Sequence, residues 1–243
     1  MKKSMPGKNE DKETYIVVER SEEASGVVTL SLTLSSGGIP SFISGQFVTV
    51  YFPMTGTPEG KAYSISSAPH EKVLSITVKA MGEFSNRLCA LRLGENISAS
   101  LPYGYFWSES DKSSLVLIAG GIGITPLRSV IRHALVQTPS RRIKLFYSVK
   151  REEDIIFRKE FDRFEKEHGN FSVAYFITRG PHPSPPFLSG RMNSNSIVKS
   201  LGSLTTTEFF LCGSVPFVGD LWRGLRASGV PEEAIYTEAF FTQ

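Results

Sequence analysis

Short runs of β-branched and aromatic residues, separated by turn residues, fill the first part of the chain from residue 14 to about residue 101. The runs are TYIVVE, GVVTLSLTL, GQFVTVYF, AYSIS, VLSITVKA and NISASL. Within residues 28–34 an apolar side chain stands at every second position, which is typical of a strand with one buried face. Breaks such as SSGGIPS and TGTPEG separate the runs, so the pattern predicts five or six strands in an antiparallel barrel or sandwich.

The pattern changes after residue 113, where apolar runs alternate with segments of helical period. LVLIAGG is a continuous apolar run that ends in glycines, as a strand buried on both faces does. The next segment, TPLRSVIRHALVQ, has a helical period, with Thr125 suited to the N-cap and Pro126 to the first helical position. Strands are then expected at IKLFYSV, FSVAYFIT and EFFLCGS, and helices at residues 152–169 and 218–229. This alternation predicts a doubly wound parallel sheet with helices on both faces.

The change of pattern divides the chain into two expected domains, a β domain at residues 14–108 and an α/β domain at residues 114–243. The polar segment SESDKSS links them, and residues 1–13 are expected to form a disordered tail, because they hold charges but no apolar run. The longest apolar stretch, residues 115–127, has 13 residues with three glycines and falls short of the ~18–20 residues of a membrane span. With neither a membrane span nor a secretory signal, the cytoplasm is the expected location.

Cysteine, histidine and charge exclude several function classes. The chain has two cysteines, too few for a disulfide scaffold or for an iron–sulfur centre with four cysteine ligands, so any electron carrier it holds is organic. Its four histidines stand far apart, which argues against a zinc site. The net charge is +3, and residues 113–243 carry 16 Lys/Arg against 12 Asp/Glu. Without a basic run this excess does not indicate nucleic-acid binding, but it suits a phosphorylated ligand or an acidic protein partner.

A glycine-rich turn, GGIGITP at residues 120–126, joins the first strand of the α/β half to its first helix. Glycines let a ligand approach the backbone, and the start of a helix presents free N–H groups to a phosphate. The segment differs from the Rossmann GxGxxG pattern, because Pro126 occupies the third glycine position. A phosphate site is therefore predicted, and the alternative is a tight turn that binds no ligand.

Two short motifs in the β half, KAYS at residues 61–64 and GEFSNR at residues 82–87, are weak signals by themselves. In this order before GGIGITP, they resemble the ferredoxin–NADP⁺ reductase superfamily, which pairs a Greek-key FAD barrel with a nicotinamide-nucleotide domain. KAYSISS is similar to the family's R-x-Y-S flavin motif, GEFS to its G-x-x-S pyrophosphate motif and LPYGYF to its P-x-G-x-F. TRG, LCGSVPF and the terminal TEAF complete a resemblance that spans about residues 14–240.

For FAD, the resemblance implies binding by Lys61, Tyr63, Ser64, Gly82, Phe84, Ser85 and Phe240. Tyr63 would pack against the flavin, and Ser64 would lie beside its N5 edge. Lys61 stands where the family has arginine, and it supplies a positive charge without the bidentate fork. An aromatic residue near the C-terminus would shield the flavin face, and either Phe240 or Phe241 could do so.

For the nicotinamide nucleotide, the resemblance implies binding by Gly121, Gly123, Thr125, Lys150, Arg151, Arg179, Cys212 and Gly213. Ser64, Cys212 and Glu238 would form the catalytic group. NADPH is favoured over NADH, because basic side chains pair with the 2′-phosphate of NADPH.

The implied function is transfer of a hydride from NADPH or NADH to FAD, with electrons passed onward to a separate protein. Ferredoxin, flavodoxin or an oxygenase component would serve as acceptor, because the cysteine count excludes an iron–sulfur domain on this chain. Two alternatives stay open, a free-flavin reductase of the same fold and a flavoprotein subunit without catalytic activity. The sequence carries no signal for an oligomeric state.

Overall fold

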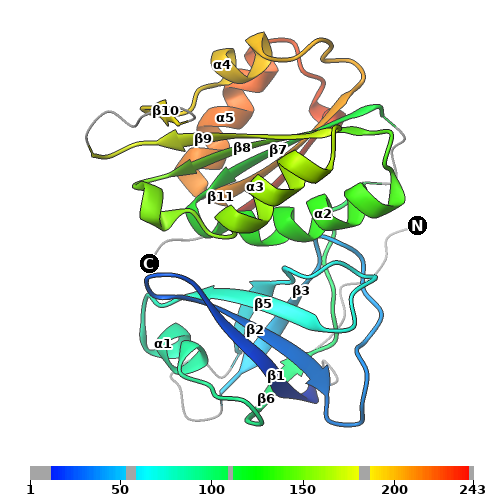
Figure 1. Ribbon diagram of the computed structural model, residues 1–243, viewed down its shortest axis with the longest axis vertical. Coiled ribbons are helices and arrows are strands. Elements are labelled where there is room, and N and C mark those ends of the chain that lie inside the picture. The colour runs from blue at the N-terminus through cyan, green and yellow to red at the C-terminus, as the bar shows by residue number, and fades with distance from the viewer. Residues whose placement is uncertain (1–11, 53–58, 109–111, 181–186, 241–243) are drawn as a thin grey trace.

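The computed structural model describes residues 12–52, 59–108, 112–180 and 187–240. Its first six strands form one antiparallel sheet in the order β4-β3-β6-β1-β2-β5 (Figure 1). They are β1 (Lys12–Ala24), β2 (Val27–Leu34), β3 (Phe47–Tyr51), β4 (Lys61–Ser64), β5 (Leu74–Lys79) and β6 (Asn96–Ser100). A backbone bridge between Ile65 and Ile76 joins the two edge strands, so the sheet closes into a barrel. The short helix α1 (Glu83–Cys89) lies between β5 and β6 in the chain.

Strand β2 shows how the alternating pattern is used. Val28, Leu30 and Leu32 point into the barrel core. The polar positions between them, Thr29 and Ser31, are buried as well, and their hydroxyls bond to those of Thr77 and Ser75 on the neighbouring strand β5. The predicted antiparallel barrel is confirmed. Strand β1 begins two residues earlier than expected, at Lys12, which pairs with β6 instead of belonging to a tail.

The other six strands form a parallel sheet in the order β10-β9-β8-β7-β11-β12. They are β7 (Ser114–Gly120), β8 (Arg142–Val149), β9 (Phe171–Ile177), β10 (Leu188–Ser189), β11 (Thr207–Ser214) and β12 (Ile235–Phe240). Helices α2 (Ile124–Gln137) and α3 (Arg158–Glu167) cover one face, and α4 (Ser194–Lys199) and α5 (Val215–Ala227) the other. The predicted doubly wound sheet is confirmed. Since β8 and β11 flank β7 on opposite sides, the strand order reverses at β7, where such sheets bind ligands.

Three predicted helix starts are wrong. Helix α2 begins at Ile124 after Gly123, and Thr125 Oγ1 donates 3.1 Å to Ile122 O instead of capping the helix. The helix expected from residue 152 begins only at Arg158, because a short 3-10 turn and a left-handed Phe157 precede it. Helix α5 begins at Val215, three residues earlier than predicted. A proline stands in its first turn, where a backbone N–H has no partner within the helix and its absence costs no hydrogen bond.

The two halves are in close contact. Phe106, which follows the barrel, packs its ring edge-on against Phe210 of β11, with 5.3 Å between ring centroids. In Figure 1 helix α2 lies between the parallel sheet and the barrel. We propose residues 14–108 and 114–243 as the two domains. In the part of the chain that the structure describes, no helix is long and apolar enough to span a membrane.

Candidate functional site

A cavity of about 940 Å³ lies between the barrel and strand β12. Its walls include eight residues that the sequence predicts for the site: Lys61, Tyr63, Ser64, Gly82, Ser85, Thr125, Glu238 and Phe240. The fold thus brings the KAYS, GEFS and TEAF segments together with the start of α2. Phe241 lies outside the described residues.

Ser64 and Glu238 meet in the wall of this cavity. Ser64 Oγ donates 2.9 Å to Glu238 Oε1, which joins the end of β4 to β12 across 174 residues of sequence. Glu238 Oε2 is buried and has no hydrogen-bond partner among the described atoms. Burial raises the pKa of Glu238 from 4.5 to about 7, and the hydrogen bond from Ser64 opposes part of this rise. Glu238 can therefore hold or release a proton near neutral pH.

Cys212 lies next to Glu238 but does not line the cavity. The two residues are paired in the parallel register of β11 and β12, and the Cys212 side chain is fully buried in the core of the α/β half. Burial raises the pKa of its thiol well above the usual range. Gly213 also lies away from the cavity, against the ring of Phe217. A catalytic role for Cys212 stays a prediction.

The two glycines predicted for the nucleotide have different surroundings. Gly121 has a left-handed backbone with φ of +54°, and no atom lies within 4 Å of where a Cβ would stand. Gly123 is buried against β11, since a Cβ there would lie 2.3 Å from Cys212 O. Gly121 is thus open to a ligand, whereas Gly123 allows the close packing of the turn on β11.

On the barrel side, Phe84 is buried in the core and stacks behind Tyr63, with 6.3 Å between ring centroids. It supports the cavity wall instead of lining it. The Ser85 hydroxyl accepts from the Met81 and Gly82 N–H groups and donates to Gly82 O, so it organises the turn itself. The space beside Gly82 is open.

The predicted basic residues lie together, away from the cavity, at the carboxyl ends of β8 and β9. Arg179 N–H donates 2.8 Å to Lys150 O, which holds the two loops side by side. Arg151 pairs with Glu153 at 3.6 Å, and both side chains are exposed. These residues form an exposed basic surface that a phosphate group could reach.

Several cavity residues are missing from the sequence prediction. Lys79 ends strand β5, and Met81 follows it, both on the cavity wall. Tyr105 also lines the cavity and is 89% exposed. Tyr105 lies within LPYGYF, so the motif could have pointed to it, whereas Lys79 and Met81 carry no motif of their own.

The cavity suits a dinucleotide such as FAD by its own chemistry. Tyr63 provides an aromatic wall, and Lys61 and Lys79 provide positive charge for phosphates. The open space beside Gly82 leaves room for a phosphate at the cavity wall. No group of three or more potential metal ligands occurs among the described residues.

Comparison with known proteins agrees with this arrangement. Residues 117–221 match the oxidoreductase NAD-binding domain family. The chain is 27% identical to flavohemoprotein A of Dictyostelium discoideum over 250 residues, which cover 95% of this chain and 60% of that protein. The flavohemoprotein of Bacillus subtilis is 27% identical over 239 residues, which cover 94% and 59%. The chain thus spans about three fifths of these curated relatives.

Two solved structures share the fold over nearly their whole length. The FAD/NAD-binding domain of a nitric oxide dioxygenase from Vibrio cholerae superposes with a TM-score of 0.85 at 22% identity, covering 95% of this chain and 99% of that one. A ferredoxin NADP⁺ reductase from Neisseria gonorrhoeae with bound FAD and NADP gives 0.79 at 21% identity, with the same coverage. The chain has the fold of these FAD/NAD-binding reductases, an antiparallel barrel followed by a parallel α/β domain, and the α/β part matches the oxidoreductase NAD-binding domain family over residues 117–221.

Proposed function

We propose that this chain binds FAD in the cavity, takes a hydride from NADPH or NADH and delivers electrons to a separate protein. The Ser64–Glu238 hydrogen bond carries the proposal, because it places a hydroxyl and a titratable carboxyl together in the cavity wall, where the two halves meet. Bound FAD would supply a ring that accepts a hydride and gives up electrons one at a time.

The chain's own residues would hold FAD from the barrel side. Tyr63 offers a flat ring in the wall, backed by Phe84. Lys61 and Lys79 offer two point charges to the pyrophosphate in place of one bidentate arginine. The Gly82 N–H and the Ser85 hydroxyl already bond to each other within the turn, so Gly82 would contribute open space for a phosphate beside the two lysines.

Ser64 and Glu238 would handle protons. Ser64 Oγ can relay a proton between a ligand in the cavity and Glu238 Oε1, because a hydroxyl can accept one proton as it gives up its own. Since the pKa of Glu238 is raised to about 7, the carboxyl can take up or release this proton at neutral pH. Cys212 would act as a small buried neighbour that desolvates Glu238, in line with its full burial.

NADPH is the proposed nucleotide. Lys150, Arg151 and Arg179 gather on two adjacent loops at the sheet edge where ligands of this fold class bind. Glu153 neutralises Arg151 in part, whereas no ion pair of Lys150 or Arg179 occurs among the described residues. Gly121 has open space beside its backbone and would admit the pyrophosphate of the nucleotide.

The electron acceptor would be a second protein such as a ferredoxin, a flavodoxin or an oxygenase component. Two exposed apolar side chains, Met81 and Tyr105, stand at the cavity with Lys61 and Lys79. An acidic acceptor would complement this basic edge and the net charge of +4 on residues 113–243, which hold 16 Lys/Arg and 12 Asp/Glu.

Anaerobic reduction tests the proposed function. Purified protein is loaded with FAD, and its flavin absorbance is followed after addition of NADPH or NADH. We expect one FAD per chain and rapid loss of absorbance, faster with NADPH. Reduced protein is then mixed with ferredoxin, flavodoxin, an oxygenase component and a haem globin to find the acceptor. Protein that takes up no flavin, or whose flavin neither nucleotide reduces, would contradict the proposal.

A free-flavin reductase is the second candidate, favoured by Lys61 in the place of the arginine that grips the FAD pyrophosphate in the family. Gel filtration of the flavin-loaded protein distinguishes the two candidate functions. Flavin that remains with the protein supports the electron-transfer role, whereas flavin that leaves the protein but is still reduced in turnover supports the alternative. Bound flavin that neither nucleotide reduces would indicate a subunit without catalytic activity.

A further inference from the structure

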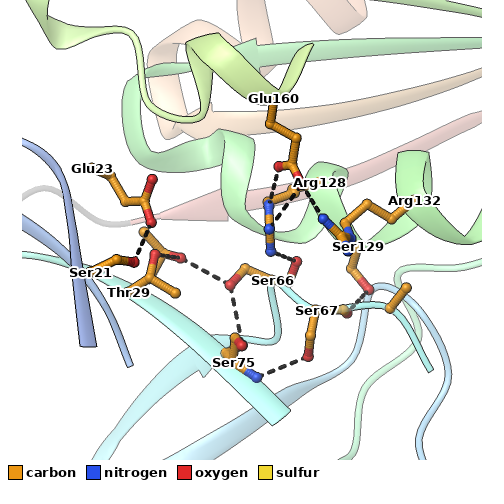
Figure 2. A network of polar contacts seen from close by, with 12 residues as sticks. Ser21, Glu23, Thr29, Ser66, Ser67, Ser75, Arg128, Ser129, Arg132 and Glu160 are labelled. Carbon is orange, nitrogen blue, oxygen red and sulfur yellow. Dashed lines mark hydrogen bonds and ion pairs between the residues drawn. The ribbon is translucent and has the colours of Figure 1, made fainter. Parts of the chain in front are cut away.

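Polar side chains join the start of α2 to the barrel loop that follows β4 (Figure 2). Arg128 donates from Nε and Nη2 to both carboxylate oxygens of Glu160 on α3, at 2.6 and 3.1 Å. Its Nη1 donates 2.8 Å to Ser66 O of the barrel. The next residue, Ser129, donates from Oγ to Ser67 O at 2.6 Å. One guanidinium group thus bonds to both halves of the molecule.

The Arg128 side chain is largely buried, with 14% of its surface exposed, as is that of Glu160. Its guanidinium also lies 4.5 Å from the centroid of the Phe157 ring. Phe157 has a φ of +61°, a conformation that is strained for a bulky residue and persists only where its surroundings hold it. Arg128 therefore also holds the residue from which α3 begins.

Arg132, one turn further along α2, extends the contact. It pairs with Glu160 and, at 2.5 Å, with Glu71 at the far end of the barrel loop. Two cations and two carboxylates balance in charge, as groups with little exposure require. The barrel loop is thus bound to α2 near both of its ends.

This contact lies directly behind the cavity wall. Thr125, which lines the cavity, precedes Arg128 by three residues on α2, so the two are neighbours on one helix face. Ser64, also in the wall, precedes Ser66 by two residues. Lysine could not replace Arg128, because a single ammonium cannot reach Ser66 O and both oxygens of Glu160 in one plane.

We infer that Arg128 is a positioning residue for hydride transfer, which holds the nucleotide turn at the start of α2 in place against the strand that carries Ser64. The inference rests on the proposed function and adds to it a residue that does not line the cavity. Small misplacements of reacting groups can cost about 100-fold in rate, so the loss of this contact slows the chemical step. FAD binding is spared, because the groups that would hold its pyrophosphate belong to the barrel.

The test compares Arg128→Lys with Arg163→Lys, a matched control on α3 whose side chain is 57% exposed. In stopped-flow reduction, we expect the limiting rate of Arg128→Lys to fall at least about 10-fold, with FAD content and half-saturating NADPH nearly unchanged. Hydrogen exchange is measured on the same proteins without nucleotide. Amides of residues 66–72 and of the first turns of α2 should exchange about 10-fold faster in Arg128→Lys only.

Unchanged reduction and unchanged exchange in Arg128→Lys would overturn the inference, as would a raised half-saturating concentration of NADPH with an unchanged limiting rate. If wild-type protein is not reduced at all, the proposed function fails instead, and the exchange data still report on the contact. Should Arg128→Lys fail to fold, Ser129→Ala tests the same contact between α2 and the barrel loop, because it removes only the hydrogen bond to Ser67 O. It should slow reduction about two- to five-fold, and an unaltered rate would overturn the inference.

Discussion

Among single residues, Glu238 links the site to the stability of the molecule. Its carboxyl is largely desolvated, and one oxygen has no partner among the described atoms. Burial favours the neutral acid and raises the pKa to about 7. The native state therefore binds this proton more tightly than the unfolded chain does. The resulting stabilisation is complete below about pH 4.5 and is lost as the pH rises through about 7.

Substitution Glu238→Gln removes this dependence on pH while keeping the size of the side chain. We expect the variant to gain stability relative to wild type as the pH rises from about 5 to about 8, by on the order of 2 kcal/mol. Urea denaturation of both proteins at a series of pH values measures the difference. Glu233→Gln, an exposed change on the turn before β12, is the control and should show no such trend. A constant difference between Glu238→Gln and wild type would contradict the raised pKa.

The sequence could predict these residues only in part. Tyr63, Ser64 and Ser85 stand in local motifs, and the cavity does include them. The contact of Ser64 with Glu238 joins segments 174 residues apart, so no local pattern encodes it. Lys79 faces the cavity only because the barrel closes beside it, and its own neighbours in sequence give no sign of this.

At the scale of elements, the close approach of the α2 turn to β11 sets the position of the nucleotide site. Gly123 lies directly on the backbone of Cys212 and Gly213, with no space for a Cβ. Both neighbours are backbone atoms of a central strand, which cannot move aside as a flexible side chain would. Any larger residue must therefore push α2 away from the sheet.

Substitution Gly123→Ala should lower the free energy of unfolding by about 1–3 kcal/mol, through this overlap. It should also weaken NADPH binding, because the turn that admits the nucleotide moves with α2. Denaturation and nucleotide titration measure the two effects. Gly169→Ala is the matched control, since its Cβ would meet nothing within 4 Å and its φ is not positive. A Gly123→Ala protein as stable as Gly169→Ala would refute the proposed overlap.

The predicted elements differ from the observed ones where tertiary contacts decide. The strands are predictable because period-two and continuous apolar runs record which faces are buried, as in β2 and β7. The start of α3 is not, because the apolar residues before it have a pattern that also suits a helix. Phe157 is left-handed there, and Arg128 of another helix packs on its ring. A contact between residues this far apart in the chain cannot be predicted from the local sequence around Phe157.

At the scale of the whole molecule, two histidines face each other where the halves meet. His70 lies in the barrel loop and His133 on α2, with 6.5 Å between ring centroids and 27° between ring planes. His133 Nδ1 is buried and lacks a hydrogen-bond partner within the described part of the chain. Burial, and secondarily the nearby His70, lowers the pKa of His133. The interface thus favours a neutral His133, and protonation would work against the contact between the halves.

We therefore expect His133 to make the molecule less stable in acid. Around pH 6 the unfolded chain binds this proton more readily than the native state, so the free energy of unfolding drops as the pH falls below about 6.5. Glu238 acts in the opposite direction over an overlapping range, so variants must be compared at each pH. As the pH is lowered from about 7.5 to about 5.5, the urea midpoint of His133→Gln should rise relative to that of wild type measured at the same pH. His168→Gln, at the end of α3 away from the barrel loop, should keep the wild-type slope. A His133→Gln slope equal to that of His168→Gln would show that protonation of this residue does not affect the interface.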